Sequence, residues 1–272
     1  MVVFPNAKIN IGLNILRKRE DGYHDLETLF YPIGLKDSLE YVANGKDYVN
    51  FTASGLNLNI EPEQNIVLKA YRRMQEQHSL PGLDIHLHKV IPQGAGLGGG
   101  SADAAFFLKS VNEHFELKIA LEQLKKMAGS LGADCAFFLD NRPAYATGTG
   151  DLLSLIDVNL NGYHLLVVKP NFGVDTRNAY SGVVPHEYPF NFKEIIGGKL
   201  SGWKGLIKND FEKSLFLKFP ELDLLKTRLS EMGADYVSMS GSGSSVYAIF
   251  DTKPAVCQED FPPSYFVWQQ EL

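Results

Sequence analysis

The chain has 272 residues, enough for one large domain or two modest ones, each with a core of its own. Its 44% apolar and 21% charged residues are the balance of an ordinary soluble globular protein. A net charge of -6 argues against a general binder of nucleic acid or of anionic membranes, and no apolar run approaches the length of a membrane span.

The two cysteines, Cys135 and Cys257, are too few for a framework of disulfides, which favours a reducing cytoplasm. Cys135 stands beside an apolar run and is predicted to be a small core residue rather than a nucleophile. The opening MVVFPNAKINIG is not a signal peptide, because Asn6, Lys8 and Asn10 interrupt its apolar stretch. We therefore expect a cytoplasmic protein, and no feature indicates its oligomeric state.

The segment AKINIGLNI, residues 7–15, alternates between apolar and polar residues and predicts a strand. One face of this strand is apolar, whereas the other carries Lys8, Asn10, Gly12 and Asn14. That second face could simply be solvated, yet it would also suit the wall of a polar cleft. A hairpin turn is predicted at residues 20–22, EDG, and it would present Tyr23 and His24 just past the turn.

A helix is predicted near residues 65–78, and the stretch after it, LDIHLHKVIPQGAGLGGGSADAA at 83–105, predicts a strand, a loop and a helix. Ser101 or Asp103 could cap the first turn of the second helix. The loop holds five glycines: Gly94, Gly96, Gly98, Gly99 and Gly100. A plain turn needs one or two, so five indicate something large pressed against the backbone. Bare amides at a helix N-terminus bind anions, and we interpret the loop as a phosphate site.

The loop does not fit two common phosphate motifs. The Walker pattern fails because Ser101 and Ala102 follow the glycines, with no Gly-Lys-Ser/Thr. Gly94, Gly96 and Gly99 formally satisfy G-x-G-x-x-G, but a dinucleotide site also needs a second strand ending in an acid about 20 residues later. Residues 116–131 instead have helical spacing, which would place the acid in range, Glu122, within a helix.

The segment LGADCAFFL, residues 131–139, follows this helix, which is predicted to stop at Gly132. Asp134 lies directly before an apolar run that should be buried, so its carboxylate must find a partner. A helix cap or a structural hydrogen bond would explain it equally well.

The second half has a different order of elements. Turns are predicted at 147–162, a strand at 163–169, helical patterns near 201–232, and two strands around the glycine-serine loop in VSMSGSGSSVYAIF. Strands and helices do not alternate as in a doubly wound sheet, so the fold class is predicted to be α+β. We place a domain boundary near residue 155, giving domains of 1–155 and 156–272.

Five segments, in order along nearly the whole chain, resemble the GHMP superfamily of small-molecule kinases: AKINIGLNILRKREDGYHDLETLF, PQGAGLGGGSADAA, LGADCAFFL, KPNFGVDTRNAY and GSGSSVYAIF. Glycine loops are common to the superfamily. AKIN followed by DGYH, and the triple glycine before Ser101, resemble the branch that acts on 4-diphosphocytidyl-2-C-methyl-D-erythritol in the non-mevalonate isoprenoid pathway. The resemblance implies an N-terminal nucleotide-binding domain, a C-terminal ferredoxin-like domain, and an active site in the cleft between them.

The resemblance also implies ATP as co-substrate, with Mg²⁺, for the phosphorylation of a hydroxyl on this small-molecule substrate. Asn65, which could otherwise cap a helix, and Lys89, otherwise an exposed strand end, match the adenine contacts. The residues implied around the ATP phosphates are Pro92, Gly94, Gly96, Leu97, Gly98, Gly99, Gly100 and Ser101.

Asp134 matches the catalytic base of such kinases, and Lys8 matches its cationic partner. Tyr23 and Tyr180 match the two aromatics that sandwich cytosine, with His24 at the edge of the base. Asn10 and Thr176 match polar groups at the methylerythritol end; Thr176 could otherwise cap a helix at 177–182. These roles agree with the chemistry, because phosphoryl transfer needs mainly alignment and charge neutralisation.

The sequence departs from the family pattern at a few positions. Ala102 stands where many members of the branch have a second serine, and Gly99-Gly100 stand where other GHMP kinases have Ser-Ser. No residue is therefore assigned to Mg²⁺. Tyr180 replaces a common Phe, which preserves stacking.

Three alternatives remain open on the sequence. Another GHMP kinase, for a mevalonate derivative, homoserine or a sugar, is disfavoured by Tyr23-His24. A dinucleotide-dependent oxidoreductase lacks the required acid. A non-catalytic nucleotide-binding module would have no need of both Lys8 and Asp134.

Overall fold

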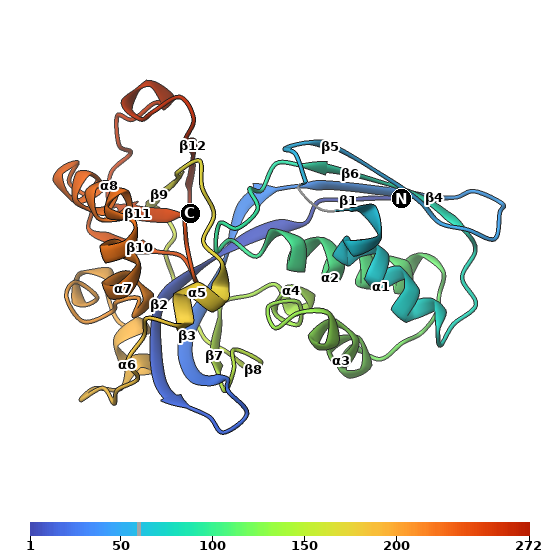
Figure 1. Cartoon of the computed structure of the whole chain (residues 1–272), viewed down its shortest axis with the longest axis horizontal. Helices are drawn as coiled ribbons and strands as arrows, with labels where there is room; N and C mark the ends of the chain where they lie inside the picture. Colours follow the sequence, from blue (N-terminus) through green and yellow to red (C-terminus); the bar gives the residue numbers. More distant parts are fainter. Residues whose placement is uncertain (59–60) are drawn as a thin grey trace. The chain divides into compact units, whose positions relative to one another are not determined.

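A computed structural model of the chain describes residues 1–58 and 61–272 (Figure 1). These residues form two compact units whose sequence ranges interleave. Unit 1 comprises residues 1–8, 34–93 and 98–142, and unit 2 comprises residues 9–33, 94–97 and 143–272. The predicted boundary at residue 155 is a single cut, whereas these units exchange segments because two long strands begin or end in unit 1. That boundary stays a prediction.

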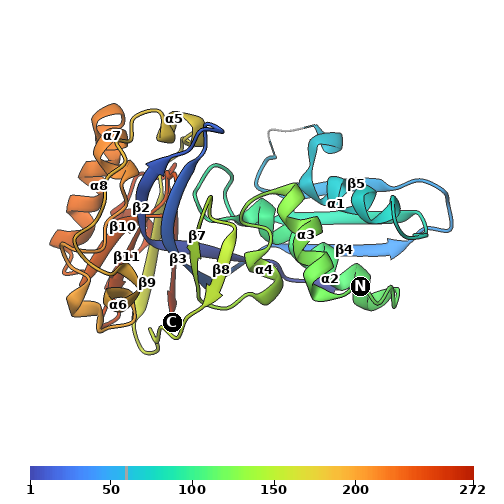
Figure 2. The same cartoon turned by 90° about the horizontal axis from the view of Figure 1, so that it is seen from below.

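Unit 1 is a four-stranded sheet with helices on one of its faces (Figures 1 and 2). The strand order is β1-β4-β6-β5, in which only the β5–β6 pair is parallel. Its strands are β1 Val2–Val3, β4 Ser38–Ala43, β5 Asn50–Gly55 and β6 Leu83–Lys89. Its helices are the 3₁₀ turn η1 Pro62–Gln64, α1 Ile66–Gln75, α2 Gly99–His114, α3 Leu121–Leu131 and α4 Phe137–Asp140.

The predicted alternation of residues 83–88 is confirmed, because Leu83, Ile85 and Leu87 of β6 are buried while Asp84 and His88 are exposed. Asn65 begins α1 as its N-cap, accepting a 2.8 Å hydrogen bond from the amide of Val67. The expected cap of α2 is wrong: Ser101 and Asp103 lie inside the helix, which starts one turn earlier.

Unit 2 contains most of the second sheet, of order β2-β3-β7-β8, and all of the third, of order β10-β11-β9-β12. The second sheet comprises β2 Asn6–Lys18, β3 His24–Lys36, β7 Ala144–Thr147 and β8 Leu152–Leu155. The third comprises β9 His164–Lys169, β10 Tyr236–Met239, β11 Val246–Phe250 and β12 Phe266–Glu271. The helices are α5 Thr176–Tyr180, α6 Phe192–Ile196, η2 Leu200–Gly202, α7 Phe211–Lys218, α8 Pro220–Glu231 and η3 Gln258–Asp260.

The third sheet has the antiparallel strand order of a ferredoxin-like unit, with α7 and α8 on one face (Figure 2). Val246, Ala248 and Phe250 of β11 belong to the core shared with α7 and α8. Tyr247, which points to the opposite face, donates its hydroxyl hydrogen bond to the carbonyl of Asn10 on β2. A short 3₁₀ turn, η3, stands where the second crossover helix of such a fold would be.

The predicted helical stretch at 201–232 is divided. Pro220 cannot occupy a helix interior, and the residue before a proline avoids helical backbone, so α7 ends before Phe219 and α8 starts at Pro220. Across the described residues, no helix is long and apolar enough to cross a membrane.

Candidate active site

An ion pair in unit 1 joins two of the predicted site residues. Lys8 Nζ lies 3.2 Å from Asp134 Oδ2. The Lys8 side chain is 3% exposed and that of Asp134 is 32% exposed, so the lysine is enclosed and the carboxylate still reaches solvent. A buried ammonium requires such a partner. Asp134 is not a helix cap, because Ala136 precedes the first turn of α4.

The polar face of β2 is not a solvated face. Lys8, Asn10 and Asn14 are all at most 3% exposed, so this simpler explanation of the alternating strand is wrong. A glycine at position 12 is required by close packing, since a Cβ there would lie 2.6 Å from the ring of Phe192.

The Lys8–Asp134 pair lies at the start of α2. Gly98 is the N-cap of α2, with φ of 70°, and a Cβ on it would lie 3.1 Å from Lys8 Cε. Gly100 is exposed, and its nearest neighbour, at 3.7 Å from the same ideal position, is Ile66. The amides of the first turn have no partners within the helix, and the helix dipole is positive there. An anion bound at this end would therefore lie beside the ion pair.

The first residues of α1 and the end of α3 also adjoin this helix start. Gly100 lies next to Ile66, which follows the cap residue Asn65. The Gly132 backbone, where α3 ends as predicted, lies near the side chains of Ser101 and Cys135. Burial raises the pKa of the Cys135 thiol to about 12, so this residue is a core residue and not a nucleophile.

Lys89 is not the exposed strand end that the sequence allowed. Its side chain is 3% exposed, and its ammonium binds the carboxylates of Asp37 at 2.5 Å and Asp103 at 2.8 Å. Pro92, half-buried, follows directly on this strand end. The ammonium lies under the start of α2, since a Cβ on Gly99 would be 3.0 Å from it.

In unit 2, the first part of the glycine loop packs against the glycine-serine loop at 240–245. A Cβ on Gly96, whose φ is 70°, would lie 1.9 Å from the carbonyl oxygen of Ser240. The Ser240 hydroxyl donates to the Gly96 carbonyl at 2.8 Å. The amides of Ser244 and Ser245 donate to the carbonyls of Gly94 and Ala95, both at 3.2 Å. Neighbouring Leu97 is 1% exposed, so the loop is anchored in the core.

The same glycine-serine loop holds Asn10 and Thr176. The Asn10 amide donates to the Ser240 hydroxyl at 3.1 Å, and its side-chain nitrogen donates to the Thr28 hydroxyl, also at 3.1 Å. Thr176 is the first residue of α5 and lies with its hydroxyl 3.2 Å from that of Ser242. Asp175 caps α5, so the alternative that Thr176 is the cap is wrong.

His24 stacks on Tyr180, with ring centroids 5.0 Å apart and planes at 23°. Tyr180 also meets Phe211 edge-on, at 4.8 Å and 84°. Tyr23 is 66% exposed. Partial burial, followed by the positive charge of Lys18, lowers the pKa of His24 from its ordinary 6.5, so the imidazole is neutral at pH 7. A neutral imidazole offers one donor and one acceptor to a ligand.

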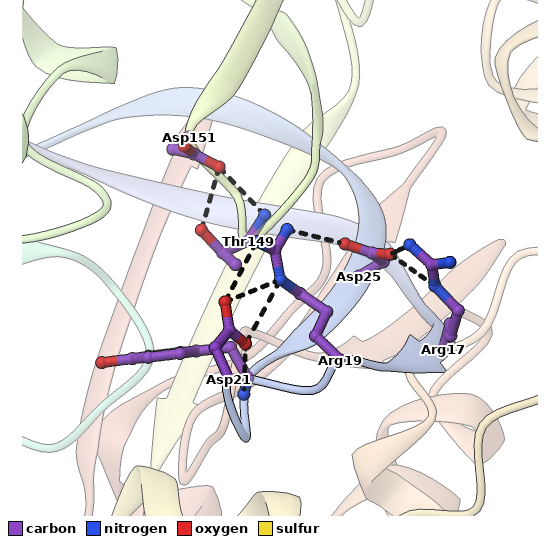
Figure 3. Close-up of polar contacts among 7 residues, drawn as sticks. Arg17, Arg19, Asp21, Asp25, Thr149 and Asp151 are labelled. Atoms are coloured by element: carbon purple, nitrogen blue, oxygen red, sulfur yellow. Dashed lines mark hydrogen bonds and ion pairs between the residues drawn. The ribbon is translucent and has the colours of Figure 1, made fainter.

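Tyr23 and His24 follow a hairpin turn that is held by ion pairs (Figure 3). Arg19 contacts the carboxylates of Asp21 and Asp25, and Arg17 contacts Asp25 at 2.6 Å. Asp21 also accepts a 3.0 Å hydrogen bond from the amide of Tyr23. The predicted turn is confirmed, with Gly22 at φ of 87°.

Two family models match this chain, and together they cover more than half of it. Residues 65–142 match the N-terminal domain of GHMP kinases, and residues 192–258 match the C-terminal domain. A relative from Bacteroides fragilis named 4-diphosphocytidyl-2-C-methyl-D-erythritol kinase is 50% identical, with the whole of both chains aligned. A relative of the same name from Parabacteroides distasonis is 46% identical, again over all of both chains.

The chain belongs to the 4-diphosphocytidyl-2-C-methyl-D-erythritol kinases of the GHMP family. A crystal structure of a 4-(cytidine 5'-diphospho)-2C-methyl-D-erythritol kinase is also similar, with a TM-score of 0.79, 32% identity, and coverage of 92% of this chain and 90% of that one. A homoserine kinase from Cytophaga hutchinsonii has a TM-score of 0.65 at 17% identity, covering 97% and 94% of the two chains, and shares the fold alone. As a member of this family the chain is an ATP-dependent small-molecule kinase.

Sequence reasoning missed several residues that support this kinase site. Ser240 joins Asn10 to the glycine loop, and the GSGSS motif around it was the available signal. Buried Asn209 holds the same loop by donating to the carbonyls of Met239 and Gly241, both at 2.8 Å. Asp37 and Asp103 were also missed, because no sequence motif pointed to them.

Proposed function

We propose that the chain transfers the γ-phosphoryl group of ATP to a hydroxyl of 4-diphosphocytidyl-2-C-methyl-D-erythritol, in the non-mevalonate route to isoprenoid precursors. The proposal rests on the names of full-length relatives and on one feature of the site: the Lys8–Asp134 pair beside the N-terminus of α2. That juxtaposition offers a proton acceptor and a cation next to amides suited to phosphate. A module that only bound nucleotide would have no use for it.

In this proposal, the α2 N-terminus and residues 94–101 hold the phosphates, with Pro92 at the entrance of the loop. Asn65 and Lys89 belong to the nucleotide end of the site. Asp134 is the member of the ion pair with access to solvent, so it can orient the alcohol and accept its proton. Lys8, which is enclosed, stabilises the alkoxide that forms and the charge on the phosphoryl group.

Mg²⁺ fits this site as a partner of ATP rather than as a resident metal. Among the residues that the structure describes, no group of three or more His, Cys, Asp or Glu side chains is placed to hold a metal ion. Mg²⁺ commonly keeps several waters and binds through substrate phosphates with few protein carboxylates. When bound, it neutralises charge on the phosphates during transfer.

The acceptor end consists of residues in unit 2. Tyr180 and Tyr23 are proposed to stack on cytosine, while neutral His24 bonds the edge of the base and must leave room for it on the face of Tyr180. Asn10 and Thr176, both attached to the glycine-serine loop, are proposed to bind the methylerythritol end. We also propose a cytoplasmic location, in keeping with the free thiols of Cys135 and Cys257.

An enzyme-linked assay of ADP release tests the proposal directly. The purified chain is incubated with ATP, Mg²⁺ and the cytidine diphosphate substrate, and in parallel with mevalonate, phosphomevalonate, homoserine and a sugar. We expect turnover with the cytidine diphosphate substrate, at a kcat/KM at least a hundredfold above the others, on the order of what an aromatic sandwich and base-edge contacts supply. Comparable rates with another alcohol would assign the chain to a different branch of the family.

A further inference from the structure

Three charged side chains form a cluster in the interior of unit 1, below the start of α2. Lys89 Nζ lies 2.5 Å from Asp37 Oδ2 and 2.8 Å from Asp103 Oδ2. All three side chains are at most 3% exposed. The other oxygen of Asp103 has no hydrogen-bond partner among the described residues, although it is buried. Such an arrangement is expensive to bury, and apolar residues could often replace it without loss of stability.

The cluster connects the segment that leads into the glycine loop with the helix that follows it. Asp37 stands between β3 and β4, and its second oxygen accepts hydrogen bonds from the amides of Val90 at 2.6 Å and Ile91 at 2.8 Å. Those two residues lead into the loop. Asp103 lies one turn after Gly99, in the first part of α2, where the loop ends.

Lys89 lies between these two attachments. A Cβ on Gly99 would be 3.0 Å from the lysine ammonium and 2.7 Å from Ile91 Cγ2. The backbone at the start of α2 therefore rests on the lysine head group and on the strand end that carries it. Displacement of the ammonium would therefore disturb the backbone at this end of the helix.

We infer that Asp37, Lys89 and Asp103 are positioning residues that hold the two ends of the phosphate loop in register, and that Lys89 acts on ATP through the backbone at Gly99 rather than through its ammonium. This inference rests on the proposed function, because it takes the start of α2 as the phosphate site. It differs from a direct lysine–nucleotide contact in one respect: the aspartates must matter as much as the lysine does.

Paired substitutions separate the two roles. Lys89→Met leaves Asp37 and Asp103 without a buried cation, and we expect KM for ATP to rise about tenfold or more, the size of the interaction energies found for residues in one network. Asp103→Leu breaks the same link from the helix side and should raise KM for ATP by a similar factor. Because the two residues act through one link, the double variant should lose no more than either single variant does. KM for the alcohol substrate should stay unchanged in all three, and Lys109→Met, an exposed lysine of the same helix, is the matched control.

An Asp103→Leu variant with the parent's KM for ATP would overturn the inference, since a lysine that contacts ATP directly does not need this carboxylate. If Lys89→Met fails to fold, two substitutions at position 103 test the inference without it. Asp103→Ala favours the helix but removes the acceptor for Lys89, and should raise KM for ATP, whereas Asp103→Asn keeps an acceptor and should not. Equal KM values for ATP in Asp103→Ala and Asp103→Asn would also reject the inference. Absence of turnover in the unmodified chain would refute the proposed function instead.

Discussion

Lys8 and Asp134 form one ion pair but have unequal access to solvent, and this difference separates their roles. The ammonium of Lys8 is enclosed and paired with Asp134, so it has little access to an incoming alcohol. The carboxylate, about one-third exposed, can meet a ligand and keep its partner. A proton acceptor needs that access, and the lysine supplies the charge that holds the alkoxide.

Asp134→Asn is expected to lower kcat by roughly 10² to 10⁴, the span usual for loss of a general base, because the amide retains the size of the side chain but cannot take a proton. Lys8→Ala should also lower kcat. The double variant should lose much less than the product of the two effects, since groups that act as a unit are not additive. ATP binding, measured by titration without the alcohol, is the control and should survive in Asp134→Asn. Activity near that of the parent in Asp134→Asn would leave the residue only an orienting role.

His24 provides a pH test of the acceptor end. Its pKa lies below the ordinary 6.5 because burial and the charge of Lys18 disfavour the imidazolium, so the neutral ring persists as pH falls to 6.5. If the neutral ring binds the base edge, the affinity for the cytidine diphosphate substrate should be highest at pH 7 to 8 and should weaken as the buffer becomes acidic and the ring is protonated. Calorimetric titration without ATP measures this affinity. His24→Gln, which stays neutral, should bind more weakly at neutral pH but with no further acid loss; an identical acid loss in the variant would exclude His24 as its source.

At the scale of the elements, the glycines of the glycine loop are present for two different reasons. Gly96 meets the Ser240 carbonyl, Gly98 meets Phe138 and Lys8, and Gly99 meets Ile91, so the protein itself excludes a Cβ at each. A Cβ on Gly100 would make only an ordinary van der Waals contact, 3.7 Å from Ile66 Cγ2. Most of the loop glycines are therefore required by packing of the chain on itself. Gly100 is the exception among the five, because the nearest atom to a Cβ there would be 3.7 Å away.

Gly96→Ala and Gly100→Ala should accordingly behave differently. At Gly96 the added Cβ would lie 1.9 Å from a backbone oxygen, and φ of 70° is unfavourable for alanine, so we expect a lower melting temperature together with a higher KM for ATP. At Gly100, in the first turn of α2, alanine should leave the melting temperature unchanged or raise it, since alanine favours a helix by up to about 1 kcal/mol over glycine. A raised KM for ATP in Gly100→Ala would then identify the ligand side of the loop. Loss of stability in Gly100→Ala would contradict this division.

Local patterns in the sequence predicted several of the elements, whereas the site residues were named through the family resemblance and stay predictions. Alternation predicted β6, the motif EDG predicted the turn before Tyr23, and Asn65 was a recognisable start for α1. The partner of Asp134 could be named only through the family resemblance. Contacts between distant segments left no local signal: Ser240 reaches Gly96 across 144 positions, and Asp37 reaches Lys89 across 52. Burial of the whole polar face of β2 was likewise invisible in a pattern that fits a solvated strand.

At the scale of the whole molecule, the two proposed substrates are assigned mainly to different units. Lys8, Asn65 and the start of α2 belong to unit 1, whereas Tyr23, His24 and Tyr180 belong to unit 2. The chain passes between the units at several points, and two of them are in the glycine loop, whose residues 94–97 group with unit 2 and whose continuation from Gly98 groups with unit 1.

This assignment predicts that substitutions in the proposed cytosine site change one KM and not the other. Tyr23→Ala should weaken binding of the cytidine diphosphate substrate by about 1 to 3 kcal/mol, the range for stacking of a base on an aromatic ring, whereas Tyr23→Phe should have little effect. Tyr23 is 66% exposed, so neither change should lower the melting temperature. Tyr180→Ala should give a similar loss of binding, with some loss of stability because its ring also packs on Phe211.

ATP affinity should stay constant in all three variants, measured by nucleotide titration in the absence of the alcohol. Tyr48→Ala, an exposed tyrosine in unit 1, is the control for loss of an aromatic ring as such and should change neither KM. If Tyr23→Ala shifted the KM for ATP as much as that for the alcohol, the tyrosine would not belong to a separate acceptor site. If Tyr23→Phe were as damaging as Tyr23→Ala, its hydroxyl rather than its ring face would carry the recognition.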